Sequence, residues 1–119
     1  MRSDRGAAVV WSLALMAVLG LVAYVGAAVG ALAVARQQAA TVADLAALAA
    51  AQSAVDPCDR ARAVAATNAV QLVGCRVEGD DVVVDLRARV PTIAAGFLAA
   101  IGAAASGLDV SARAGAPGA

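Results

Sequence analysis

The first half of the chain is dominated by one long apolar segment. Arg2, Asp4 and Arg5 precede it, and residues 6–35 contain no charged side chain. As an α-helix these 30 residues would extend about 45 Å, whereas the hydrocarbon core of a bilayer is about 30 Å thick. Because helices that are apolar on all sides belong in membranes or large protein cores, the pattern predicts a transmembrane helix over residues 6–35.

The helical pattern continues beyond the apolar segment. Residues 36–54 contain neither Gly nor Pro and are rich in Ala, Gln and Leu, all of which favour helices. We therefore expect a single helix that begins at Gly6 and continues, outside the bilayer, to about residue 55. The Asp56-Pro57 pair should end it, because a residue that precedes proline disfavours the α conformation.

Small residues recur along this predicted helix. Alanine occupies every fourth position from Ala23 to Ala51, and Gly26 and Gly30 form a GxxxG pair. Because such spacing lets helices approach closely in a membrane, the segment is predicted to associate with other helices. Asp44 is the only acidic residue between Gly6 and the predicted helix end. It is either solvated or paired with an arginine of a neighbouring helix.

The positions after the long helix predict a small head that starts with a second helix. Asp56 suits the N-cap, Pro57 suits the first helical position, and Gly74 suits the C-terminal cap. Between these ends, a set of residues recurs at helical spacing. The set is Ala61, Val64, Ala65, Asn68 and Leu72.

The rest of the head has the pattern of a small sheet. Residues 75–78 are extended, the Gly79-Asp80 pair supplies a turn, and residues 82–90 alternate between apolar and charged side chains. Residues 108–114 alternate again and predict a third strand. Residues 91–107 are apolar and interrupted by glycine, which predicts a crossover or a short helix. The predicted fold is α+β: a long helix, a short helix and an antiparallel sheet of about three strands.

The composition narrows the functions open to such a chain. It is 62% hydrophobic but only 3% aromatic, and its nine Arg residues are balanced by nine acidic residues. Nucleic-acid binding needs clustered basic side chains, so no nucleic-acid partner is expected. The absence of His and Lys, with only two Cys, removes the usual nucleophile-activating bases and metal ligands. We expect no metal, no cofactor and no enzymatic activity.

Cys58 and Cys75 bracket the predicted second helix. They lie too far apart for a CxxC redox motif, and without His they do not form a zinc site. A disulfide between them would close a loop of 18 residues and contribute about 3 kcal/mol in the chain-entropy model. Two free thiols are the alternative. A persistent disulfide would place the head in an oxidising compartment, outside the cytoplasm.

The charges near the apolar segment indicate the same orientation. Arg2 and Arg5 precede the apolar segment, and by the positive-inside rule they favour a cytoplasmic N-terminus, although Arg36 follows directly. The predicted organisation is a cytoplasmic segment 1–5, a transmembrane helix, and an extracytoplasmic head over residues 56–115. The last four residues, 116–119, are expected to form a disordered tail.

A removable signal peptide is the competing interpretation of the N-terminal segment. Ala33-Val34-Ala35 has the small-x-small pattern that a signal peptidase recognises, and cleavage after Ala35 would release a small disulfide-bonded binding module. Against this, the apolar region of a signal peptide is usually about 7–15 residues long, half the length of this one.

Three stretches of the chain carry a family resemblance: DRGAAVVWSLAL, ARQQAATVADLAALAAA, and DPCDRARAVAATNAVQLVGCRVEGDDVVV, which holds both cysteines and Asn68. They resemble the TadE/TadG-like family of Tad pilus and secretion systems. In particular, these stretches look like a short TadE-like group found in actinobacteria beside a secretion ATPase. A long helix bearing a small α/β head is also the plan of pilins and pseudopilins.

The resemblance implies a minor pilin-like structural subunit held in the cell membrane by a single helix. Its partners would be other pilin-like subunits and a membrane platform with its ATPase, reached as a homo- or hetero-oligomer through the N-terminal helix. The head would be extracytoplasmic and could be exposed at the cell surface.

The resemblance also implies a processing site. A prepilin peptidase would cut between Gly6 and Ala7. Pilins usually carry a Glu five residues after the cut, where this chain has Trp11, a side chain suited to the membrane interface. A processed filament subunit and an unprocessed, permanently membrane-bound assembly factor both fit this pattern.

Overall fold

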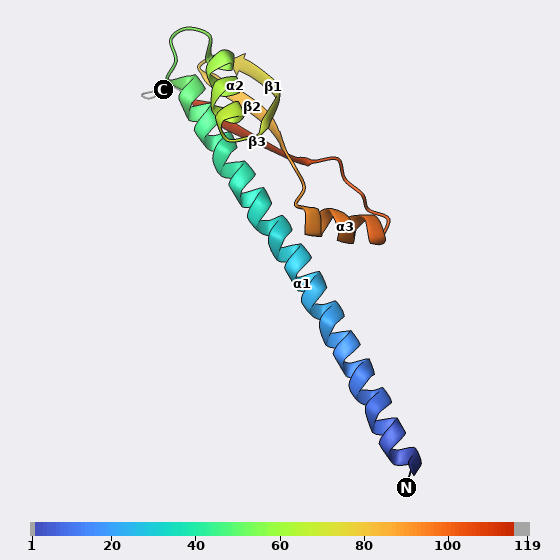
Figure 1. Cartoon of the computed structure of the whole chain (residues 1–119). Helices are drawn as coiled ribbons and strands as arrows, with labels where there is room; N and C mark the ends of the chain where they lie inside the picture. Colours follow the sequence, from blue (N-terminus) through green and yellow to red (C-terminus); the bar gives the residue numbers. More distant parts are fainter. Residues whose placement is uncertain (1, 116–119) are drawn as a thin grey trace.

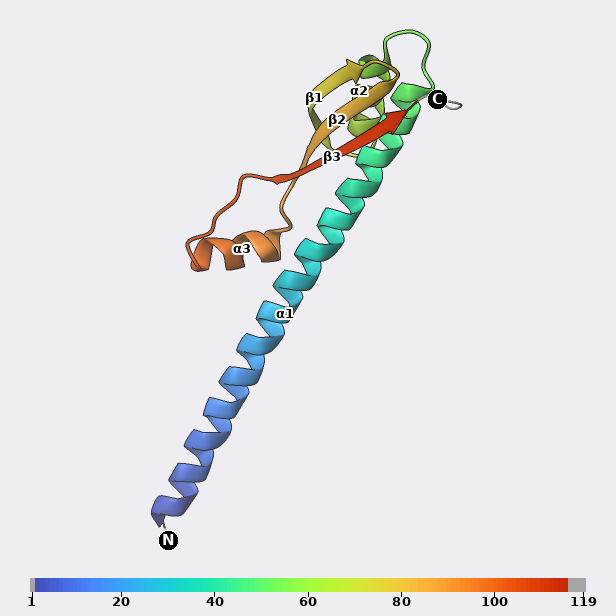
Figure 2. The same ribbon diagram turned by 180° about the vertical axis from the view of Figure 1, so that it is seen from behind.

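The computed structural model describes residues 2–115 as a long helix that carries a small head on its C-terminal half (Figures 1 and 2). Helix α1 covers Arg2–Ala51, and the molecule is 82 Å long but only 25 by 21 Å across. The other elements, in chain order, are α2 (Pro57–Thr67), β1 (Gln71–Glu78), β2 (Asp81–Ala88), α3 (Thr92–Ala100) and β3 (Leu108–Gly115). The predicted α+β, pilin-like layout is confirmed.

The three strands form one antiparallel sheet in the order β1-β2-β3. The strand predicted over residues 82–90 is observed as β2, and the strand predicted over residues 108–114 is observed as β3. Val84 pairs with Cys75 on one side and with Ala112 on the other, so these three side chains share a face. That face packs on α1 and α2, while the opposite face carries most of the charged residues.

A bulge in β1 sets which of its side chains point inward. The pairing slips between Leu72 and Gly74, so that Leu72 lies opposite Leu86 and Gly74 lies opposite Asp85. The extra residue breaks the strict alternation, and as a result Leu72 and Cys75, three residues apart, both pack against the core. Without the bulge, Cys75 and Leu72 would face opposite sides of the sheet.

The main core is formed by alanines of α1 and α2 and by the inner face of the sheet. Val84 and Leu86 of the central strand are its largest fully buried side chains. The buried alanines of the two helices are Ala43, Ala46, Ala47, Ala50, Ala61 and Ala65. Because alanine has the smallest side chain that still fills space, the two helices and the sheet lie close together, but little apolar area is buried per residue.

A second, smaller core lies lower on α1, where α3 approaches it. Val90, Ala94 and Leu108 are buried there, and Leu32 and Ala35 of α1 pack against them. The apolar segment 91–107 therefore contains a short helix, one of the two predicted alternatives. The helix contacts α1 and lies well below the sheet (Figure 1).

The predicted end of α1 was placed too late. The helix ends at Ala51, and residues 52–56 form a loop before α2, so the Asp56-Pro57 pair starts the second helix without ending the first. Asp56 occupies the N-cap position of α2, but its backbone is left-handed (φ 49°, ψ 63°) and its side chain makes no capping hydrogen bond. The predicted N-cap position of Asp56 is therefore confirmed, but its side chain does not make the hydrogen bond expected of that position.

The second helix is also shorter than predicted. It ends at Thr67, so Leu72 and Gly74 belong to β1 and not to a helix. The cap is made by Asn68 and Ala69: the Asn68 amide Nδ2 donates to the Val64 carbonyl at 2.8 Å, and Ala69 takes a left-handed φ of 56°. Helical spacing over 57–72 did not reveal this end because Ala69 stands where glycine is usual.

The cap of α2 has the hydrogen bonds of a Schellman motif. The Val70 N–H donates to the Ala65 carbonyl at 2.9 Å, and the Ala69 N–H donates to the Ala66 carbonyl at 3.1 Å. These bonds hold Ala69 in the left-handed conformation, which residues other than glycine adopt at a cost of about 1 kcal/mol. The predicted disordered tail, residues 116–119, lies outside the described residues.

Replacing Ala69 by glycine should stabilise the head by about 1 kcal/mol, because glycine takes the left-handed conformation without steric cost. The free energy of opening can be followed by amide hydrogen exchange of β2 in the detergent-solubilised full chain. Ala63→Gly, at an exposed position in the middle of the same helix, is the matched control and should destabilise by about 1 kcal/mol. An A69G variant no more stable than the parent would contradict the strained cap.

Candidate functional site

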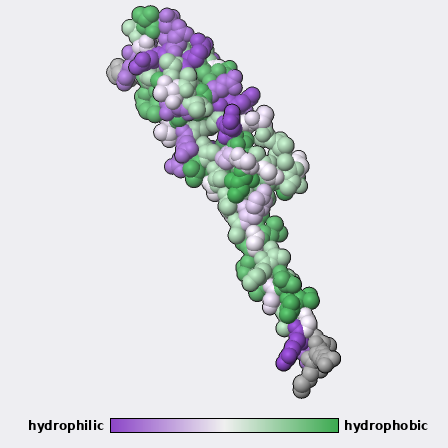
Figure 3. Space-filling model, viewed as in Figure 1, coloured by the Kyte–Doolittle hydropathy of each residue, from purple (hydrophilic) through white to green (hydrophobic). Residues whose placement is uncertain are grey.

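The N-terminal half of α1 is a bare apolar shaft. Over the described side chains before Val25, every residue of α1 is exposed, and Trp11 is 76% exposed. The helix is long and apolar enough to cross a membrane, and no part of its most apolar window is buried within the chain. Figure 3 shows strongly hydrophilic residues at the N-terminal tip and over the head, with mostly apolar and pale residues between them.

The residues of the predicted processing site lie at the start of this shaft. Gly6 and Ala7 are both exposed and are part of the continuous helix α1. Trp11 lies on the next turn, also exposed. Nothing in the head reaches these residues, so a peptidase that approaches the N-terminal end of α1 meets no obstacle from the rest of the described chain.

The GxxxG pair lies on an open side of the shaft. A side chain placed on Gly26 or Gly30 would meet no atom within 4 Å outside the helix's own adjacent backbone. Asp44 is exposed beside the head, at the edge of a shallow groove that also includes Arg113 and Leu48. No ion pair of Asp44 occurs within residues 2–115, since Arg113 is bound to Glu78 and Asp81 instead.

The outer face of the sheet is covered by a network of ion pairs. Arg76 donates from Nε to the Glu78 Oε1 at 2.7 Å and lies 3.4 Å from Asp85, while Arg113 binds Glu78 and also Asp81, the latter at 3.0 Å. The hydrogen bond from Arg76, assisted by the charge of Arg113, holds the pKa of Glu78 below its ordinary value. These groups are exposed and screened by water, so the network contributes little stability and chiefly sets the charge pattern of this face.

The network also shields one apolar residue. Val83 points to the outer face of β2, directly between Arg76 and Arg113 on the neighbouring strands, and is only 6% exposed. At the other end of the sheet, Arg87 pairs with Asp109 at 2.8 Å, and this pairing raises the pKa of Arg87. The outer face is therefore polar and self-paired, which suits contact with water or a polar partner surface.

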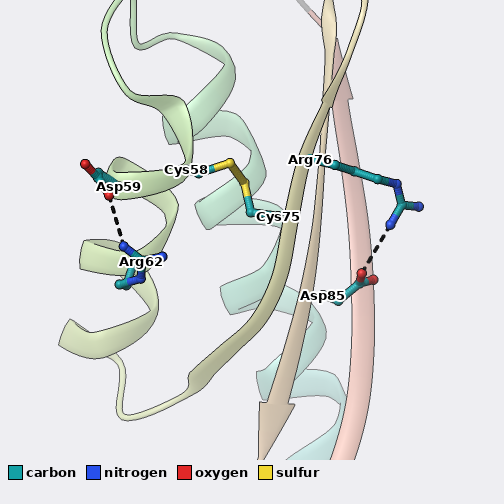
Figure 4. Close-up of a disulfide and its surroundings, with 6 residues drawn as sticks. All are labelled: Cys58, Asp59, Arg62, Cys75, Arg76 and Asp85. Atoms are coloured by element: carbon teal, nitrogen blue, oxygen red, sulfur yellow. Dashed lines mark hydrogen bonds and ion pairs between the residues drawn. A yellow bond between two sulfur atoms is a disulfide. The ribbon is translucent and has the colours of Figure 1, made fainter.

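The structure joins Cys58 and Cys75 by a disulfide, which links α2 to β1 (Figure 4). The Cα atoms are 5.7 Å apart, and the two residues are separated by 17 positions in the chain. Cys58 lies in the first turn of α2, and the β1 bulge turns Cys75 toward it. Of the two alternatives open from the sequence, the structure has the bridge and not the free thiols.

The described residues offer no obvious chemistry for bond-breaking. Residues 2–115 contain no cluster of three His, Cys, Asp or Glu side chains placed to hold a metal ion. A groove on the sheet's outer face holds Asp85, Asp109 and Ser111, but the chain has no His or Lys to activate the hydroxyl. The arrangement is suited to binding through shape, apolar surface and charge.

One contact was missed by the sequence reasoning. The rings of Tyr24 in α1 and Phe97 in α3 pack edge to face with their centroids 6.3 Å apart. These are two of only three aromatic residues in the chain, at positions 73 residues apart. The only sequence signal for this pairing is that residues 6–35 and 90–108 are both apolar. That signal does not say which residues of the two segments meet.

Loss of the disulfide should destabilise the head by about 3 kcal/mol, because the unfolded head regains the freedom of an 18-residue loop. Amide hydrogen exchange of β2 in the full chain would be compared for the parent and the Cys58→Ala, Cys75→Ala double variant. A reductant should bring the parent to the level of the double variant and leave the double variant unchanged. Equal protection in all four samples would show that the bridge does not stabilise the head.

Comparison with known families supports part of this picture. Residues 6–53 match the sequence model of the family described as Putative Flp pilus-assembly TadE/G-like. The match spans nearly all of α1 and two residues beyond it, which is less than half of the chain. No curated protein and no solved structure matches the chain. The match supports the TadE/G-like resemblance for α1 and, with it, a subunit associated with pilus assembly.

Proposed function

We propose that the chain is a non-enzymatic, minor pilin-like subunit of a Tad-type pilus or secretion apparatus, held in the cell membrane by α1. The observation that carries this proposal is the shaft itself. Residues 6–22 of α1 expose every side chain although they are almost entirely apolar, and they fall inside the segment that matches the TadE/G-like family. Exposing such a long apolar helix to water is unfavourable, whereas a bilayer or a bundle of similar helices would bury its apolar surface.

The proposed orientation is N-terminus cytoplasmic and head extracytoplasmic. The Cys58–Cys75 disulfide supports it, because structural disulfides persist outside the reducing cytoplasm. The charged residues also favour it: Arg5 lies at the end of the shaft remote from the head, and the positive-inside rule places such residues in the cytoplasm.

The proposed partners are other pilin-like subunits and the membrane platform with its ATPase. The open side of α1 at Gly26 and Gly30 is the surface we propose for contact with a neighbouring helix, since small residues let helix backbones approach closely. Asp44, exposed and without an ion pair in the described chain, would find an arginine on that neighbour. Homo- and hetero-oligomers both fit this arrangement.

The secreted-module alternative is less well supported. Cleavage after Ala35 would remove Leu32, which packs in the second core, and Tyr24, which packs on Phe97. It would also cut through the segment 6–53 that matches the family. A released head would keep the α1 alanines of the main core, but α3 would lose the part of α1 on which it packs.

The intact mass and N-terminal sequence of the native protein test this proposal directly. We expect a membrane-bound chain that is either cut between Gly6 and Ala7 or uncut, and that copurifies with other pilin-like subunits or the platform. If it is cut, Gly6→Leu should abolish cleavage, while Gly20→Leu, the same change at another exposed glycine of α1, should not affect it.

The three possible termini have different meanings. A terminus at Ala7 supports a processed filament subunit despite Trp11, and an uncut chain supports a permanent assembly factor. A terminus at Arg36, with the protein in the culture medium, would overturn the membrane-anchored proposal in favour of the secreted module. A chain that remains monomeric and without partners after mild cross-linking would overturn the assembly role.

A further inference from the structure

We propose that α3 and the loop after it, residues 92–107, form a second membrane contact, which lies in the interfacial region of the bilayer on the head side. This inference rests on the proposed anchoring of α1 and adds a lipid-binding surface to it. The proposed occupant of the exposed side of α3 is lipid, and not a protein.

The first argument is the level at which α3 meets α1. All the α1 residues that define this contact come from the uncharged segment 6–35: Tyr24 packs on Phe97, and Leu32 and Ala35 pack in the second core. Ala28, at the same level, is 1% exposed. If residues 6–35 are in the membrane or its interface, α3 is held at the same depth.

The second argument is that the charged regions of the chain end at one common level. Apart from Arg5–Gly6 at the far end of α1, the long uncharged segments meet charged sequence at three places: between Ala35 and Arg36, between Arg89 and Val90, and between Leu108 and Asp109. These places are far apart in sequence, yet the apolar residue at each one belongs to the second core. Residues 90–108 between the last two carry no charge at all.

A membrane surface explains this alignment, because it is a plane at which the solvent changes for every segment that reaches it. In a head surrounded only by water, no physical constraint requires the charged parts of three separate segments to end at the same level along α1. Figure 3 shows the result as a surface: hydrophilic residues gather over the sheet and α2, and the surface around α3 is pale to apolar. The charged boundary residues Arg36, Arg89 and Asp109 are all exposed.

The third argument fixes the depth. The apolar segment of α1 extends about 45 Å, about 15 Å more than the hydrocarbon core, so about ten of its residues lie in head-group regions. These residues are shared between the two ends of the segment, and α3 is level with the head-side end, where Leu32 and Ala35 pack in the second core. Deeper burial is unfavourable, because the irregular backbone of residues 104–107 lies outside any helix or strand and would have to satisfy its N–H and C=O groups in hydrocarbon.

The shape of α3 fits an interfacial position. It runs across the direction of α1 and not along it (Figures 1 and 2), and its nine residues are too few to span a bilayer. Ala94 and Leu98 pack in the second core beside α1, whereas Ile93 and Ile101 remain 39% and 59% exposed. Tyr24, beneath α3, is a residue type enriched at membrane interfaces.

Quenching of tryptophan fluorescence by lipid-attached quenchers tests the proposal. The full chain would be reconstituted in phosphatidylcholine vesicles that carry a doxyl group at a shallow or a deep acyl position. Trp11 is the only native tryptophan and reports on α1. In a Trp11→Phe background, Ile101→Trp reports on α3, and Val55→Trp, at a 75% exposed position in the distal loop, is the matched control.

We expect strong quenching of native Trp11 and of the I101W indole, with the shallow quencher more effective than the deep one for I101W, and no quenching of V55W. Quenching of Trp11 without quenching of I101W would overturn the α3 proposal and leave the anchoring of α1 intact. Absence of quenching at Trp11 would overturn the anchoring and the α3 contact together. The two failures are therefore distinguishable.

Two further outcomes would also contradict the proposal. If V55W is quenched as strongly as I101W, the whole head lies on the lipid and α3 has no special depth. If I101W is unquenched but its emission shifts to the blue as the protein-to-lipid ratio rises, a second copy of the chain covers α3 in place of lipid.

Discussion

The packing of the alanine face of α1 against the head is the interaction on which the rest of the structure depends. Ala43, Ala46 and Ala47 are essentially inaccessible, and the inner side chains of β2 lie against this face. It joins a helix whose N-terminal half is exposed to a head that has few large apolar residues of its own. A larger residue at any of these positions would push the sheet away from the helix, because the interior has no room for the extra volume.

The alanine-rich core gives the head little hydrophobic stabilisation, and the disulfide offsets part of this deficit. Each alanine buries little apolar area, so the main core gains less hydrophobic stabilisation than one built from Leu and Ile. Only Val84 and Leu86 are large and fully buried there. The Cys58–Cys75 bridge compensates by restricting the unfolded chain. It ties the edge strand β1 to α2, which packs on α1.

The elements that could be predicted from sequence are those whose pattern survives folding without interruption. The long helix follows from composition alone, and β2 and β3 follow from strict alternation, with Val82, Val84 and Leu86 on the buried face as expected. The first strand could not be predicted in full, because its bulge breaks the alternation at Leu72 and the same residues continue the helical spacing of α2. The left-handed Ala69 ends α2 without a glycine, so the predicted cap at Gly74 is wrong.

Candidate site residues were predictable only where one segment of sequence carried the information. The cysteines could be paired because the chain has only two, and the apolar shaft is visible in the sequence. The position of α3 could not be found, since it depends on Tyr24 meeting Phe97 and on Val90 meeting Leu32, contacts between distant segments that share only an apolar character. The ion pairs of the outer face likewise depend on the register between strands.

The same geometry decides which side of α1 remains for a neighbouring subunit. The predicted alanine repeat from Ala23 to Ala51 suggested association along the whole helix, but its distal part packs on the chain's own head. At about 100° per residue, Gly26 lies about 200° around the helix from Tyr24, on the side opposite the α3 contact. Gly30 and Asp44 fall within about 40° of the Gly26 direction. Under the proposed function, a partner helix that approaches this side would meet the small residues Gly26 and Gly30 and the carboxylate of Asp44 beside the head, without displacing α3 or the sheet.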